Sequence, residues 1–102
     1  METPLMINEV SEMGEYITSF SHINLRVIQN IPIRVSFEDG EYFIECEPLN
    51  LFSHGKTYNE AVQCFEEIFY ILWEEYVLED ESALHESGIA LRNTIKEYAE
   101  QM

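Results

Sequence analysis

The chain has few positive charges, few cysteines and no long apolar run. Lys and Arg together number five among 102 residues, against 20 Asp and Glu, which gives a formal net charge of −15 at neutral pH. Such a surface repels phosphate backbones, so direct nucleic-acid binding is disfavoured. No apolar stretch approaches the ~20 residues that span a bilayer, so we expect no membrane segment. This length predicts one domain with a modest core.

The two cysteines, Cys46 and Cys64, have no Cys-x-x-Cys spacing and lie among apolar residues. We therefore expect buried, unpaired thiols in a reducing compartment. The first residues lack the basic flank and the apolar block of a signal peptide. Together these features lead us to expect a cytoplasmic protein.

Motifs that would indicate catalysis, a metal or a cofactor are missing. The three histidines lie far apart in the sequence (His22, His54 and His85), so no metal site is predicted. Gly55-Lys56-Thr57 resembles the end of a phosphate-binding loop, but the required upstream glycine is replaced by Asn50. Three hairpin carboxylates share a non-core strand face instead of converging on a two-metal nuclease site (Glu41, Glu45 and Glu47). We predict that the protein is not an enzyme; a degenerate nuclease is the alternative.

The stretch from Ile31 to Leu78 organises the chain, and it begins with a predicted β-hairpin. Apolar and polar residues alternate before and after Asp39-Gly40, which is a strong signal for a two-residue turn. That turn fixes the register and places three residue pairs on the core face (Phe37 with Tyr42, Val35 with Ile44, Ile33 with Cys46). On the other face Arg34 lies opposite Glu45. Phe43 shares that face, and an aromatic side chain there needs a cover.

A short third strand from Leu49 to Ser53 is expected next, followed by one long helix that ends near Leu78. Thr57 is a good N-cap, and Glu60 three residues later completes a capping box. Apolar residues recur at helical spacing on the face expected to cover the hairpin (Ala61, Phe65, Ile68, Leu72 and Tyr76). The second half of the helix carries further apolar residues on other faces, which must meet the C-terminal segment or another chain.

The segments that flank this stretch are predicted to be small additions. We expect residues 1–20 to be a mobile leader and residues 23–27 to add an edge strand to the sheet. After an acidic break at 79–82, the spacing of apolar residues predicts a helix over about 86–100. The fold class is therefore α+β: an antiparallel sheet of three to four strands covered by one long helix, plus a C-terminal helix, in a single domain over 21–102.

The order of these motifs resembles the HicB-like antitoxin core. The likeness is carried by the Asp-Gly hairpin turn, the following Tyr, the Cys and Pro at the strand end, and a Gly-x-Thr turn before a helix that begins with Glu-Ala. The matching residues are Asp39, Gly40, Tyr42, Cys46, Pro48, Leu49, Gly55, Thr57, Glu60 and Ala61. In this chain Glu47 separates Cys46 from Pro48, whereas the family often has Cys-Pro directly. The segment from Leu84 to Lys96 resembles, more weakly, a C-terminal helix of compact relatives.

This resemblance implies a truncated ribonuclease-H-like fold without ribonuclease activity. Members of the family neutralise a small HicA toxin, an mRNA interferase, and often self-associate, so we expect a homodimer or a higher homo-oligomer of this chain. The acidic composition fits a protein that masks a basic RNA-binding face. Full-length antitoxins of this type carry a C-terminal DNA-binding module, for which the residues after the long helix offer no match.

Two hypotheses about function follow, and each has candidate residues. The first is a HicB-like antitoxin that binds a small basic toxin through an exposed aromatic residue and an acidic cluster (Phe43, Glu74, Glu75, Glu79, Asp80 and Glu81). The second is a stand-alone homo-oligomeric relative, of structural or unknown role, that self-associates through apolar residues of the long helix (Tyr70, Trp73 and Val77).

Overall fold

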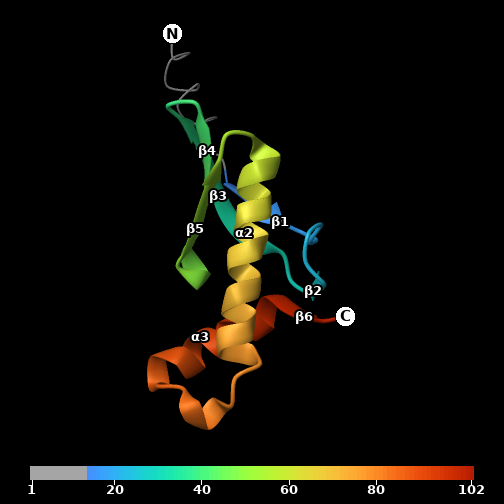
Figure 1. Cartoon of the computed structure of the whole chain (residues 1–102), viewed down its shortest axis with the longest axis vertical. Coiled ribbons are helices and arrows are strands. Elements are labelled where there is room, and N and C mark those ends of the chain that lie inside the picture. The colour runs from blue at the N-terminus through green and yellow to red at the C-terminus, as the bar shows by residue number, and fades with distance from the viewer. Residues whose placement is uncertain (1–13) are drawn as a thin grey trace.

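An antiparallel sheet forms the centre of residues 14–102, the part of the chain that the computed structural model describes. Within this range four strands lie in the order β1 (Gly14–Ile17), β3 (Ile31–Glu38), β4 (Glu41–Cys46) and β5 (Leu51–Gly55). The long helix α2 (Tyr58–Leu72) lies across one face of this sheet (Figure 1). The predicted α+β class, a small sheet with one long helix and a C-terminal helix, is confirmed.

The β3–β4 hairpin has the register that the Asp-Gly turn predicts. Val35 pairs with Ile44, and Phe37 pairs with Tyr42. Asp39 and Gly40 both have positive φ angles, 52° and 81°, as a type I′ turn requires. These pairings place one face of the hairpin towards α2 and leave the other, which we call the outer face, turned away from it.

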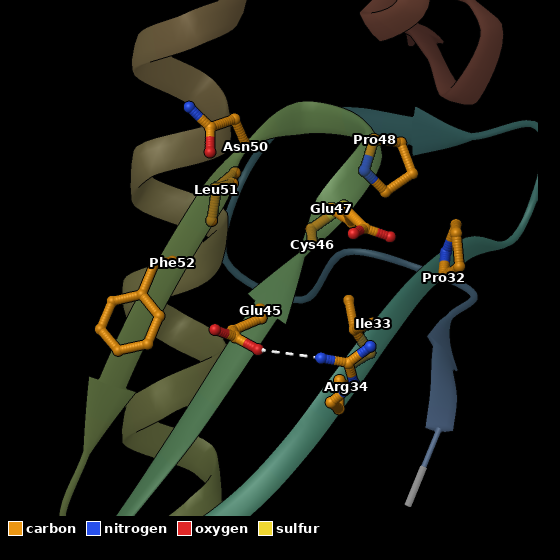
Figure 2. A pocket seen from close by; sticks show the side chains of 10 residues that line it. All are labelled: Pro32, Ile33, Arg34, Glu45, Cys46, Glu47, Pro48, Asn50, Leu51 and Phe52. Carbon is orange, nitrogen blue, oxygen red and sulfur yellow. Dashed lines mark hydrogen bonds and ion pairs between the residues drawn. The ribbon is translucent and has the colours of Figure 1, made fainter.

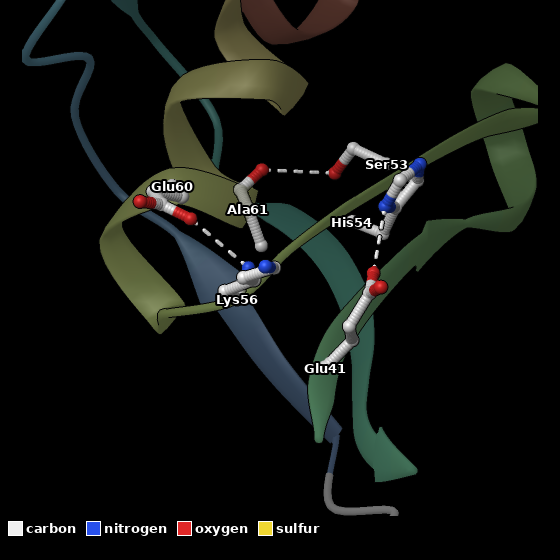
Figure 3. Close-up of polar contacts among 6 residues, drawn as sticks. All are labelled: Glu41, Ser53, His54, Lys56, Glu60 and Ala61. Carbon is white, nitrogen blue, oxygen red and sulfur yellow. Dashed lines mark hydrogen bonds and ion pairs between the residues drawn. The ribbon is translucent and has the colours of Figure 1, made fainter. Parts of the chain in front are cut away.

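The turn between β5 and α2 depends on close backbone packing. A Cβ atom at Gly55 would lie 2.5 Å from the backbone nitrogen of Ala61, so only glycine fits there. Thr57 caps the helix by accepting a hydrogen bond from the backbone N–H of Glu60 at 3.1 Å. The Glu60 carboxylate in turn accepts from the N–H of Lys56 at 3.0 Å (Figure 3). Both halves of the predicted cap are thus present, with the return bond one residue earlier than in the usual capping box.

The core lies between the sheet and a line of side chains at four-residue spacing on the helix. These helix residues are all at most 4% exposed (Ala61, Phe65, Phe69 and Trp73). Ile44 and Ile31 of the sheet face them and are fully buried. Ser53 is the polar exception on β5, and its hydroxyl donates to the Ala61 carbonyl at 3.0 Å (Figure 3).

A buried carboxylate fixes the loop between β1 and β2 (Leu25–Val27) to the helix. Glu66 of α2 has no exposed surface, and it accepts hydrogen bonds from the backbone N–H groups of Ser21, at 3.0 and 3.1 Å, and His22, at 2.6 Å. Phe20 packs beside this contact on Phe69, with ring centroids 4.9 Å apart. One helix position thereby holds a loop more than forty residues away in sequence.

The C-terminal segment closes the lower end of the molecule in Figure 1. One turn of π-helix, η2 (Trp73–Val77), follows α2, and a short 3₁₀ turn, η3 (Glu81–Ala83), leads to α3 (Glu86–Tyr98). The chain ends in β6 (Ala99–Gln101), which pairs with β2 in a second, two-stranded sheet. The predicted helix over about 86–100 is confirmed, and its last two residues belong to this strand.

The prediction for the N-terminal flank was wrong in two places. Residues 1–13 lie outside the described part, but Gly14–Ile17 is not part of a leader: it is an edge strand paired with β3. The strand near 23–27 forms as β2, yet it pairs with β6 and not with the main sheet. Short strands of this kind are placed by distant partners, which local alternation does not reveal. The third strand also starts later than predicted, because Leu49 belongs to a 3₁₀ turn, η1 (Glu47–Leu49).

Candidate protein-binding surface

The residues predicted to bind a partner are not brought together. Phe43 lies on β4, near the hairpin tip at the upper end of the molecule, whereas residues 74–81 lie at the lower end, where α2 passes into η2 and η3 (Figure 1). A single partner surface that joins Phe43 to the acidic cluster is therefore wrong for this fold.

The acidic cluster is exposed throughout, and several of its members have local structural roles. Asp80 accepts a hydrogen bond from the backbone N–H of Ser82 at 3.1 Å and so caps η3. Glu81 lies 3.9 Å from the Arg92 guanidinium. The Arg92 side chain is only 20% exposed, but at 3.9 Å this contact is long, so it and the exposed Asp80 cap contribute little to stability. They make the cluster an ordered acidic turn at the end of the helix.

The apolar residues proposed for self-association are largely covered by the chain itself. Trp73 is only 4% exposed and belongs to the same buried cluster as Ile95 and Tyr98 of α3. Its assignment to an intermolecular surface was therefore wrong. Tyr70 and Val77 are partly buried against the same core. The C-terminal segment thus supplies most of the cover that the second half of the helix requires.

The outer face of the sheet carries an aromatic patch, formed by Phe43, Phe52 and His54. The Phe43 and Phe52 rings are stacked with centroids 5.7 Å apart, and the His54 ring lies 6.0 Å from Phe43. Phe52 is 50% exposed and His54 is also exposed, whereas Phe43, which was predicted to be exposed, is only partly exposed. The pairing of Phe43 with His54, and of Glu45 with Phe52, brings the two strands' outward side chains side by side. Within residues 14–102 no element covers this patch as α2 covers the opposite face.

A groove of about 500 Å³ begins at Phe52 and crosses β4 to β3 (Figure 2). Phe52 stands on one side, and Pro32 and Pro48 stand on the other. Glu45 and Arg34 lie between them and make one long contact of 3.5 Å between Oε1 and Nη1. The groove is therefore apolar at its sides and charged along its middle.

Carboxylates outnumber cations around this groove. Glu47 lines it beside Glu45, while Arg34 is the one cation among its lining residues. Glu41 lies further along the outer face and contacts His54, with 3.0 Å between Oε1 and Nδ1 (Figure 3). The outer face thus offers carboxylates next to aromatic rings, an arrangement that suits a cationic, planar group.

The Cys46 side chain lies beneath the groove on the buried side of β4 and is 1% exposed. Burial raises the pKa of the Cys46 thiol above its ordinary value, and a weaker hydrogen bond with the Leu49 backbone acts in the opposite direction. The thiol is consequently protonated and shielded at neutral pH, which suits a packing role and not nucleophilic chemistry. Among the described residues both cysteines are free thiols.

Of the three patch residues, only Phe43 was predicted to bind a partner, and the groove was not predicted. The alternation of Leu51 and Ser53 with Phe52 and His54 assigns Phe52 and His54 to the outer face from the sequence alone, and the burial of Ser53, which is 1% exposed, agrees with that assignment. The groove itself depends on where Pro32 and Pro48 lie relative to Phe52, which no sequence pattern specifies.

Within residues 14–102 no three His, Cys, Asp or Glu side chains are grouped as metal ligands would be. None of the helices in the same range is long and apolar enough to cross a membrane. The structure thus defines a small α+β protein with an open, aromatic and acidic sheet face. Comparison of the chain with models of known families, with curated proteins and with solved structures finds no match.

Proposed function

We propose that the protein is a HicB-like, antitoxin-type binding module that neutralises a small basic mRNA interferase of HicA type by direct contact. The observation that carries this proposal is the open sheet face: an aromatic patch in which Phe52 and His54 are exposed, bordered by carboxylates, in a chain of net charge −15. The resemblance of residues 31–78 to the HicB-like core supports the same class.

Charge favours a basic protein over a nucleic acid as the partner. A ribonuclease that binds RNA needs cations to neutralise phosphates. An acidic protein attracts those cations at long range, and by occupying them it blocks the RNA-binding face. Neutralisation in this proposal needs no catalytic group on the acidic partner. It needs only a complementary surface and enough apolar contact to slow dissociation.

Self-association is the alternative, and one feature of the outer face favours it. Arg34 and Glu45 lie on the same face, so a twofold axis through that face can bring each Arg34 to a carboxylate of the other copy. Against this, each copy contributes a net charge of −15, and the repulsion works against pairing at low salt. A stand-alone homo-oligomer without a toxin partner is therefore the second candidate function.

The partner of this proposal acts on mRNA, so we place the protein in the cytoplasm. Its two free thiols fit a reducing compartment. We expect neither a direct nucleic-acid contact nor a cofactor.

The test is affinity capture of the tagged full chain from its native cells, followed by mass spectrometry. We expect a small basic protein at stoichiometric amounts, which 0.5 M salt releases because the attraction is screened over about 5 Å or less at that ionic strength. Expression of the captured protein alone should arrest growth, and co-expression of this chain should restore it. Recovery of untagged copies of this chain alone would contradict the antitoxin proposal and favour the homo-oligomer.

A further inference from the structure

We propose that the groove on the outer face accepts an arginine side chain from an extended segment of the basic protein partner. This inference rests on the proposed function and assigns a site to it. The groove runs from Phe52 to Pro32 and Pro48, and its middle carries Glu45 and Glu47. Its volume of about 500 Å³ accommodates one long side chain and its backbone.

The chemistry of the lining selects a guanidinium group. A planar guanidinium stacks on an aromatic ring and donates paired hydrogen bonds to a carboxylate. The exposed ring of Phe52 and the carboxylate of Glu45 come from paired positions on β5 and β4, so one group can contact both. A lysine ammonium is a point charge without the planar fork, so lysine should bind this groove less tightly.

The Arg34–Glu45 contact provides an internal example of the same recognition. Arg34 reaches Glu45 through one 3.5 Å contact, and both side chains are more than half exposed, at 61% and 54%. Pairs this exposed contribute little to stability. An incoming arginine can therefore displace or share this contact at little cost, while Glu47 offers a second carboxylate in the same groove.

Whole-molecule charge selects a basic partner as the occupant over a second copy of this chain. A second copy carries 20 acidic and five basic residues over its whole chain, so its net charge has the same sign as the groove. A basic segment brings the complementary sign to a groove in which carboxylates exceed cations. The apolar side chains of Phe52, Pro32 and Pro48 then exclude water around the ion pair between the incoming arginine and a groove carboxylate.

The test is a titration of the ¹⁵N-labelled full chain with two probes, a six-residue peptide that alternates arginine and alanine and its lysine counterpart. We expect saturable shifts in amide signals of β4, β5 and the turn between them, with the arginine peptide binding about threefold or more tighter than the lysine peptide. Shifts spread evenly over the acidic residues, or equal affinity for the two peptides, would overturn the proposal.

Matched variants separate the groove from general charge. Phe52→Ser and Ile71→Ser remove exposed apolar side chains of nearly equal exposure, 50% and 49%, from the groove and from α2 respectively. Glu47→Gln and Glu97→Gln each remove one exposed charge, the first inside the groove and the second on α3, outside both the groove and the acidic cluster. We expect Phe52→Ser and Glu47→Gln to weaken arginine-peptide binding about threefold to fivefold, and the two controls to change it less than twofold. Equal losses in both members of each pair would overturn the assignment.

Failure of this site and failure of the proposed function give different results. If capture yields a basic partner whose affinity is unchanged by Phe52→Ser and Glu47→Gln, the function stands and the groove is the wrong site. If capture yields no basic protein but the arginine peptide binds the groove, the recognition chemistry stands and the antitoxin function is wrong.

Discussion

Replacement of the buried Glu66 tests how the fold holds its N-terminal loop. The Glu66 carboxylate is fully buried and accepts from the backbone N–H groups of Ser21 and His22. Glu66→Ala removes both acceptor oxygens, and it leaves the two donors without their partner. A hydrogen bond to a charged group contributes roughly 1.5–3 kcal/mol, and a buried donor left unsatisfied costs about 1–3 kcal/mol.

The size of the effect follows from how much water can replace the carboxylate. Ser21 and His22 are exposed residues, so water can reach part of the loop after the side chain is removed. We therefore expect Glu66→Ala to lower the free energy of unfolding by about 2–4 kcal/mol, which is below the sum of the separate terms. Glu66→Gln keeps one carbonyl oxygen, and Oε1 is the atom that both backbone groups contact, at 3.0 and 2.6 Å. Its expected cost is smaller, about 1–2 kcal/mol.

The assay is equilibrium unfolding in urea, with the neighbouring exposed Glu67→Ala as the control. Amide exchange at Ser21 and His22 should also accelerate in Glu66→Ala, because these N–H groups lose their acceptor. We expect Glu67→Ala to stay within about 0.5 kcal/mol of the parent protein. A Glu66→Ala protein as stable as the Glu67→Ala control, with unchanged exchange at both amides, would refute this reasoning.

Three further predictions concern the sheet and its junction with α2. Gly55→Ala should cost at least about 3 kcal/mol or prevent folding, because its Cβ would meet the Ala61 nitrogen at 2.5 Å, and circular dichroism with urea unfolding measures this loss. Ser53→Ala should cost about 1 kcal/mol in the same assay, because it leaves Ala61 without the 3.0 Å hydrogen bond from the hydroxyl. Burial raises the pKa of Cys46, so its contribution to stability is complete below the unfolded-state pKa of about 8.5 and is lost as pH rises towards the folded-state value. The urea midpoint should therefore fall between about pH 8 and pH 10, and it should fall less in Cys46→Ala. A midpoint that does not change with pH would contradict the Cys46 prediction. Unchanged stability of Ser53→Ala or of Gly55→Ala would contradict the other two.

The β3–β4 hairpin was predictable because its signals are local. Alternation around Asp39-Gly40 determines both the turn and the register, and Val35 and Ile44 pair as that register requires. The helix start was predictable for the same reason, since Thr57 and Glu60 interact across three residues. Both features depend on neighbours within a few positions of the sequence.

The place of β1 and the burial of Glu66 were not predictable, because both depend on distant partners. Gly14–Ile17 is only four residues long and pairs with a strand that begins at Ile31. Glu66 and the exposed Glu67 are identical in type, and only the loop at Ser21 and His22 distinguishes them. The partners of Glu66 are backbone N–H groups, so no positively charged residue in the sequence indicates that its carboxylate is buried.

The candidate site was predictable only in part. The position of Phe43 on the outer face could be predicted from the hairpin register, because the turn assigns this residue to the face away from the helix. The groove beside Phe52 did not, because it arises from the arrangement of β3, β4 and η1 in space. Trp73 was assigned outward because the helix pattern alone does not show that α3 folds back over it.

The most direct test of the central claim is a calorimetric titration of the full chain into the basic protein recovered by capture. We expect saturable binding whose affinity falls as salt is raised from 0.1 to 0.5 M, and a weaker affinity for Phe52→Ser than for Ile71→Ser. The absence of binding to any basic protein, with the chain forming only oligomers of itself, would contradict the proposed antitoxin-type function.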